Sequence, residues 1–270
     1  MVELTHQVRV YRHLIGARMR ADWQYRTSFV LFLLGQALVA GLDFAVIAVI
    51  FSRVDVLAGW SALEVAVLYG TSGVSFGLGD LFVSQVERVA THIRAGTFDL
   101  FLLRPIGPLV QLSGAEFALR RIGRMVQPLV VLCIALPRVD VTWGLVEVAL
   151  VPVTVLSGAV IFGAIWVLTS SVAFWLVDTQ EVANAFTYGG SAVTAFPLDV
   201  LGGWLRRIVT FAVPLAFVSY VPVARLLGKP PPLGLPEPAA FAAPAVATVL
   251  ALVARQVWRV AIRHHRSTGS

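Results

Sequence analysis

One feature limits the fold of this chain more than any other: residues 148–177 contain no charged side chain. A helix needs only about 20 apolar residues to cross the hydrocarbon core of a bilayer. The whole chain is 58% hydrophobic and 13% charged, whereas soluble domains carry about 25% charged residues. The sequence therefore predicts an all-α, polytopic membrane protein rather than a soluble enzyme.

Charges, glycines and prolines divide the remainder into further apolar runs. We predict an amphipathic helix over residues 1–26 that lies in the membrane interface, followed by one transmembrane domain over residues 27–270. The six predicted spans cover about residues 27–51, 60–83, 117–136, 145–177, 182–200 and 239–261.

A further apolar stretch, residues 205–227, is interrupted by Pro214 and Pro222. Interior prolines remove backbone hydrogen bonds, which lipid cannot replace. A straight span is therefore not expected here, and we predict a re-entrant helical hairpin that enters and leaves the membrane on one side.

The distribution of basic residues predicts the orientation. Six spans and a hairpin place both termini on one face, and cytoplasmic loops carry an excess of Lys and Arg. Of the 21 Lys and Arg residues, only six fall on the other face: Arg53, Arg138, Arg206, Arg207, Arg225 and Lys229. Both termini are therefore expected in the cytoplasm. Arginines that face anionic lipid also account for the net charge of +6 without nucleic acid.

Polar and small residues within the spans suggest where helices pack. Gly70, Gly73 and Gly77 share one helical face, which favours close packing within the chain or, alternatively, at a dimer seam. Asp43 either lines a substrate path or faces protein or the hydrated interface. We also place Asn184, Thr187 and Tyr188 with Asp43 as candidate lining of a pathway or dimer seam.

Several kinds of chemistry are missing from the sequence. The single lysine, Lys229, is followed by Pro230, so the chain has no GxxxxGK[ST] phosphate-binding loop. It also has no GxSxG or HExxH motif, and its five histidines have no carboxylate partners at metal-ligand spacing. No catalytic residue, metal or cofactor is therefore expected in this chain.

The polar interruption between the second and third predicted spans, residues 84–108, carries the densest motif. Its core, IRAGTFDLFLLRP at residues 93–105, resembles the coupling region of bacterial ABC-type export permeases of the type-2 family. The matching positions are Gly96, Asp99, Leu102, Leu103, Arg104 and Pro105. The layout of the spans is similar to that family along essentially the whole chain.

The resemblance implies a permease of the bacterial inner membrane that works as a dimer, with itself or with a related permease. Two separately encoded ATP-binding-cassette subunits would bind ATP and Mg²⁺ and drive export of a hydrophobic or amphipathic substrate. The residues expected to couple to the ATPase are Glu87, Arg88, Arg94, Gly96, Phe98, Asp99, Leu102, Arg104 and Pro105. Two alternatives stay open: residues 84–108 rest on the lipid headgroups, or the chain is a non-transporting membrane scaffold that recruits a cytoplasmic partner.

Overall fold

The computed structural model describes residues 26–115, 121–176 and 180–265. These residues are almost entirely in helices and turns, with one isolated bridge between Leu57 and Trp60. The predicted interfacial helix lies outside the described residues, except for its last residue.

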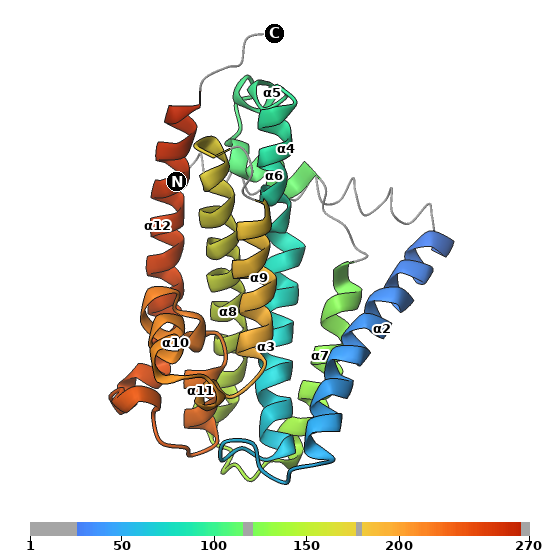
Figure 1. Cartoon of the computed structure of the whole chain (residues 1–270), viewed down its shortest axis with the longest axis vertical. Helices are drawn as coiled ribbons and strands as arrows, with labels where there is room; N and C mark the ends of the chain where they lie inside the picture. The colour runs from blue at the N-terminus through green and yellow to red at the C-terminus, as the bar shows by residue number, and fades with distance from the viewer. Residues whose placement is uncertain (1–25, 116–120, 177–179, 266–270) are drawn as a thin grey trace.

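Four long helices stand side by side, and a further pair lies beside them, with its outer helix leaning away toward one end of the molecule (Figure 1). The four upright helices are α3 (Ala62–Phe82), α8 (Leu145–Ser171), α9 (Gln180–Thr194) and α12 (Ala243–His264). The leaning pair is α2 (Arg26–Phe51) and α7 (Ile122–Ala135).

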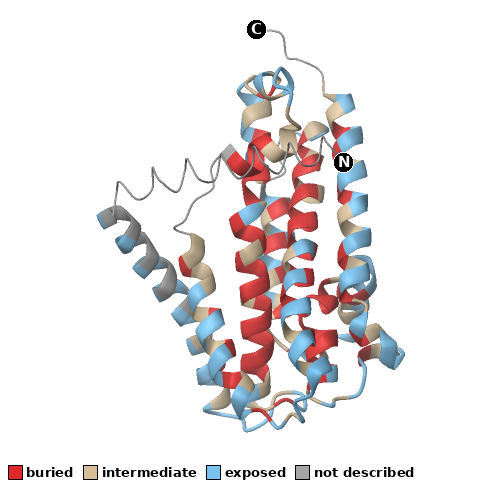
Figure 2. Cartoon of the chain, turned by 180° about the vertical axis from the view of Figure 1, so that it is seen from behind, coloured by how far each residue is buried: buried red, intermediate tan, exposed pale blue. Residues whose placement is uncertain are grey.

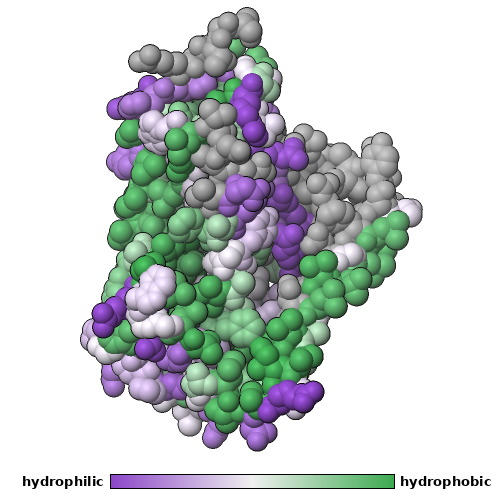
Figure 3. All heavy atoms as spheres, in the orientation of Figure 1, coloured by the Kyte–Doolittle hydropathy of each residue, from purple (hydrophilic) through white to green (hydrophobic). Residues whose placement is uncertain are grey.

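Helices α3 and α8 form the centre of the bundle. Buried residues run along the central helices, whereas the outer faces of the bundle are exposed (Figure 2). In the most apolar window of each helix, 83% of α3 is buried but only 22% of α12. Phe76 of α3 packs against Phe162 and Trp166 of α8, with ring centroids 5.2 and 5.1 Å away. On the face shown in Figure 3, the two flanks of the molecule are largely apolar, and hydrophilic residues gather toward the two ends and in a stripe between the flanks.

The glycine face of α3 packs against α7 within the chain, as predicted. A Cβ at Gly70 would lie 2.7 Å from the Cβ of Leu132, and one at Gly73 would lie 2.6 Å from the Cβ of Pro128. One at Gly77 would lie 2.8 Å from the Cβ of Met125. Real Cβ atoms do not approach so closely, so only glycine allows this separation of the two backbones.

The described residues include three helices that are long and apolar enough to cross a membrane. They are α3, α12 and the run Leu145–Phe174, in which α8 continues into the turn η4 (Val172–Phe174). The fifth predicted span is shorter than expected: α9 ends at Thr194, because Pro197 cannot continue the helix. The third is also short, since α7 has 14 residues and residues 116–120 are outside the described part.

The proline-broken stretch forms two helical segments at 76° to each other, Gly203–Ala212 and Leu215–Leu226. This is the shape expected of a re-entrant hairpin, and it is also compatible with one broken span. Its elements are α10 (Gly203–Arg207), η6 (Ile208–Ala212), η7 (Leu215–Phe217) and α11 (Tyr220–Leu226). The remaining short turns near this end of the molecule are η3 (Leu136–Arg138), η5 (Leu198–Val200), η8 (Pro232–Gly234) and η9 (Glu237–Phe241).

Candidate functional site

Residues 84–108, named here the coupling segment, form a projection beyond the end of α3 (Figure 1). The segment contains η1 (Ser84–Arg88), α4 (Val89–Arg94) and α5 (Asp99–Leu102), and α6 (Pro108–Ala115) follows it. Gly96 has a φ of +64°, a left-handed conformation that glycine adopts without steric cost. This residue allows the chain to turn between α4 and α5.

Phe98 holds the coupling segment to the rest of the molecule. Its side chain is 0% exposed, and its ring packs edge-on against Phe174 and His265, with centroids 5.1 and 5.0 Å away. Phe98, which is predicted to couple to the ATPase, therefore does not belong to the exposed surface of the segment. Its burial results from packing against residues far away in the sequence, which the local pattern did not reveal.

Two further interactions brace the same loop. The Gln111 amide donates hydrogen bonds to the carbonyls of Phe101 and Ile106, at 2.8 and 2.6 Å. Nε2 of His265 lies 2.9 Å from Oδ1 of Asp99, so the end of α12 is joined directly to the start of α5. The coupling segment is therefore a fixed feature of the fold rather than a loose loop.

The outer face of the coupling segment combines apolar and basic side chains. Leu103 is 81% exposed and Leu102 is 42% exposed, and Arg104 and Pro105 beside them are exposed as well. Of the other residues predicted for this surface, Arg88 and Arg94 are exposed, whereas Glu87, Gly96 and Asp99 are partly buried. Exposed leucines flanked by arginines form a surface suited to a protein partner.

A buried charge cluster lies at the base of the coupling segment. Asp80 is 1% exposed and forms ion pairs with Arg121 at 2.6 Å and with Arg124 at 3.1 Å. Arg121 also donates to the Ser84 hydroxyl. Burial raises the pKa of the nearby Glu87 carboxyl, and the Arg121 guanidinium opposes that rise. The cluster thus joins the end of α3 and the start of α7 to the first turn of the coupling segment.

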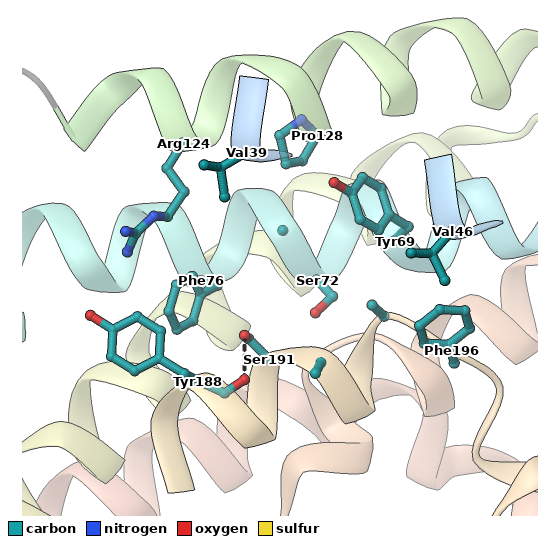
Figure 4. Close-up of a pocket in the computed structure, with 13 residues that line it drawn as sticks. Val39, Val46, Tyr69, Ser72, Phe76, Arg124, Pro128, Tyr188, Ser191 and Phe196 are labelled. Atoms are coloured by element: carbon teal, nitrogen blue, oxygen red, sulfur yellow. Dashed lines mark hydrogen bonds between the residues drawn. The ribbon is translucent and has the colours of Figure 1, made fainter. Parts of the chain in front are cut away.

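A cavity of about 400 Å³ lies between the leaning pair and the bundle, with lining residues from α2, α3, α7 and α9 and from the residues that follow α9. Arg124 and Tyr188 lie toward one end of it, and Tyr69, Val46 and Phe196 lie toward the other (Figure 4). The Arg124 guanidinium carbon is 5.7 Å from the centroid of the Tyr188 ring, which is a cation–π distance.

The wall of the cavity is mainly aromatic and aliphatic, and it also includes two serine side chains, Ser72 and Ser191. Ser72 shares a hydrogen bond of 2.6 Å with Thr194. Ser191 donates to the Tyr188 carbonyl at 2.8 Å. The cavity is therefore mainly apolar, with one cation, Arg124, near an end.

Of the described side chains predicted to line a pathway or a dimer seam, those of Asn184, Thr187 and Tyr188, one lines the cavity. Tyr188 lines the cavity, but Thr187 is 0% exposed and donates to the Ala183 carbonyl at 2.8 Å. Asn184 is partly buried and is not part of the cavity lining, and the Asp43 side chain lies outside the described residues. The sequence did not reveal that Arg124 lines the cavity. The sequence signal for Arg124 was the combination of an arginine in the first turns of one apolar span and an acidic residue, Asp80, near the end of the preceding span.

Comparison with known families decides the identity. The family model described as "ABC-2 family transporter protein" matches residues 37–269, a range that includes the coupling segment and the cavity. The chain belongs to the ABC-2 family of transporter proteins. Comparisons with curated proteins and with solved structures gave no match.

Membership confirms the resemblance seen in the sequence. The protein is a multi-pass membrane permease of an ABC transporter, and in this family the membrane subunit is not itself catalytic. An ABC-2 permease works with an ATP-binding-cassette subunit. Within the described residues, no group of three or more His, Cys, Asp or Glu side chains is arranged to hold a metal ion.

In this ABC-2 permease, Arg124 belongs both to the charge cluster and to the cavity wall. The same side chain thus contacts Asp80 at the base of the coupling segment and Tyr188 in the cavity. Arg121, one turn earlier near the start of α7, donates to Ser84 in the coupling segment.

Proposed function

We propose that this permease is the transmembrane subunit of an ATP-driven exporter. It moves a hydrophobic or amphipathic molecule across the bacterial cytoplasmic membrane, and separate subunits bind ATP and Mg²⁺. In this proposal the chain has six spans and two cytoplasmic termini, and it pairs with a second copy or a related permease.

The observation that carries the proposal is the exposure of Leu103 at the tip of a braced projection. A leucine that is 81% exposed is costly to leave in water, since burying it would contribute roughly 1.5–3 kcal/mol. Phe98 and His265 fix the backbone that presents it. A preorganised apolar tip loses little entropy when it enters a groove on a partner.

The charge cluster suggests how movement reaches the transport path. ATP binding in the partner subunits would displace the coupling segment, and Ser84 and Glu87 would move with it. Asp80 and Arg121 would pass this displacement to α7 and, through Arg124, to the cavity. Packed elements tend to switch between discrete arrangements rather than deform gradually, so the cavity is expected to open alternately to the two sides.

The test is to purify the permease from its native membrane with its ATPase subunit and to measure ATP hydrolysis. Leu103→Asp and Arg104→Ala should reduce co-purification or abolish the effect of the permease on hydrolysis. Leu145→Asp is the matched control, because Leu145 is 89% exposed but begins α8 at the opposite end of the molecule. If no nucleotide-hydrolysing protein associates with the unaltered chain, the scaffold function is favoured instead.

A further inference from the structure

We infer a second binding site, for an anionic phospholipid, in a groove that shares no lining residue with the cavity. This groove has a volume of about 640 Å³ and lies between α3, α6, α8 and α12. Its wall is almost wholly apolar, with residues such as Leu78, Leu156, Val160 and Ala251. Ser113 and Arg255 are its polar lining residues.

The charge of Arg255 determines which kind of headgroup the site would bind. The side chain is exposed, and among the residues that the structure describes it forms no ion pair or hydrogen bond. Its helix neighbours Leu252 and Val253 are 55% and 47% exposed, so this part of α12 presents an apolar surface to the surroundings. An arginine in such a setting needs an anion, and a lipid phosphate can accept two of its N–H groups at once.

The position of Arg255 along α12 suits a lipid headgroup. Nine residues separate it from the helix end at His264, which corresponds to about 13 Å along the axis. Arg259 and Arg263 follow at successive turns on the same side of the helix. The basic side chains therefore begin at the groove and continue toward the end of the molecule that carries the coupling segment.

One acyl chain of the lipid is the occupant that fits these observations. An apolar groove with a cation beside it matches a hydrocarbon chain attached to a phosphate. A second copy of the permease fits less well, because a two-fold contact through this face would bring two Arg255 cations toward each other. The lipid would lie in the leaflet on the side of the coupling segment. The inference does not depend on coupling to an ATPase.

The test uses the purified full-length chain in lipid nanodiscs with trace photoactivatable phospholipids that carry a diazirine in one acyl chain. Phosphatidylglycerol and phosphatidylcholine versions are compared, and the labelled peptides are identified by mass spectrometry. The phosphatidylglycerol probe should label α8 and α12 peptides about fivefold more than the phosphatidylcholine probe. Excess unlabelled phosphatidylglycerol should suppress this labelling, and phosphatidylcholine should not.

Two pairs of variants distinguish the effect of the Arg255 charge from the effect of the shape of the groove. Arg255→Gln should bring the ratio of the two probes close to one, whereas Arg263→Gln, on the same helix but outside the groove, should preserve the preference. Ala251→Phe should fill the groove and reduce labelling by both probes, whereas Val253→Phe on the outer surface should not.

Three outcomes would overturn the inference. They are equal labelling by both probes in the unaltered chain, an equal effect of Arg255→Gln and Arg263→Gln, and no groove labelling by either probe because a second copy covers it. The first and third outcomes are read in the unaltered protein, so the test does not depend on a variant that fails to fold.

Discussion

The Asp99 carboxylate lies 2.9 Å from Nε2 of His265, although 166 residues separate the two in the sequence. Asp99 begins α5 in the coupling segment, and His265 follows the last residue of α12. The His265 side chain is only 9% exposed, because Phe98 and Phe174 pack around its ring. The last helix of the chain therefore positions the surface that is proposed to receive force from the ATPase.

Loss of this contact should loosen the coupling segment without unfolding the protein. In His265→Gln, we expect amide hydrogen exchange over residues 93–105 to become about 2- to 10-fold faster. This corresponds to a hydrogen bond that contributes about 0.5–1.5 kcal/mol. Exchange measured by mass spectrometry checks this.

His264→Gln is the matched control, since His264 is exposed and its ring neighbours Trp175 rather than the coupling segment. Unchanged exchange in His265→Gln, or an equal change in His264→Gln, would show that the contact does not position the segment.

Neutralising Asp80 should destabilise the whole protein. Asp80→Asn leaves Arg121 and Arg124 without their shared counter-charge. Removing one partner of a fully buried ion pair costs about 3–5 kcal/mol. The arginine side chains are 20% and 33% exposed, so we expect about 2–3 kcal/mol and a lower thermal unfolding midpoint.

Asp140→Asn should change little, because Asp140 is exposed in the turn before α8. The double variant Asp80→Asn with Arg124→Gln should lose less stability than the sum of the two single variants. Strict additivity would mean that the pair contributes nothing through its interaction.

The partly buried carboxyl of Glu87 should make the stability of the protein depend on pH. Burial raises the pKa of this carboxyl above its ordinary value of 4.5. The folded protein therefore binds this proton at pH values where the unfolded chain has released it, and the free energy of unfolding falls as the pH rises through that interval. Glu87→Gln removes this contribution.

The gain in stability of Glu87→Gln relative to the unaltered chain should accordingly be larger at pH 7 than at pH 4. Thermal unfolding midpoints at the two pH values measure it. Glu237→Gln, at an exposed position near the opposite end, should give no such difference. The proposed effect of burial would be contradicted if Glu87→Gln raised the unfolding midpoint, relative to the unaltered chain, by a smaller amount at pH 7 than at pH 4.

The close approach of α3 and α7 should not tolerate a methyl group. At Gly73 the new Cβ would lie 2.6 Å from the Cβ of Pro128 and 2.7 Å from its Cγ. The proline ring cannot rotate away, so Gly73→Ala should cost about 1–3 kcal/mol. Gly189→Ala has no atom within 4 Å of the new methyl group and should not destabilise the protein. Equal unfolding midpoints for the two variants would show that the packing is looser than described.

The sequence predicts features that depend on local composition more reliably than features that depend on tertiary contacts. Hydropathy predicts α3, α8 and α12 closely, and glycine spacing predicts the face on which α3 packs. The proline positions predict the break in residues 205–227. These properties arise from the backbone and from local solvation, which the sequence displays directly.

The sequence reveals less about side chains whose surroundings come from elsewhere in the chain. Phe98 lies among arginines and short helices, a context typical of a surface, yet Phe174 and His265 bury it. Thr187 looked like a polar lining residue, but its hydroxyl is satisfied within α9. Arg124 lines the cavity because α7 leans against α3, and no local pattern reveals that arrangement.

The central claim is that the tip of the coupling segment contacts an ATP-binding subunit, and site-specific crosslinking tests it most directly. A benzoylphenylalanine photocrosslinker would replace Leu103 in the native membrane, and the same replacement at Leu145 would serve as the control. The account predicts that the Leu103 variant, and not the Leu145 variant, crosslinks to a protein with an ATP-binding-cassette nucleotide site, and that ATP alters the yield. Crosslinks from Leu103 to lipid alone, or to a protein that binds no nucleotide, would contradict it.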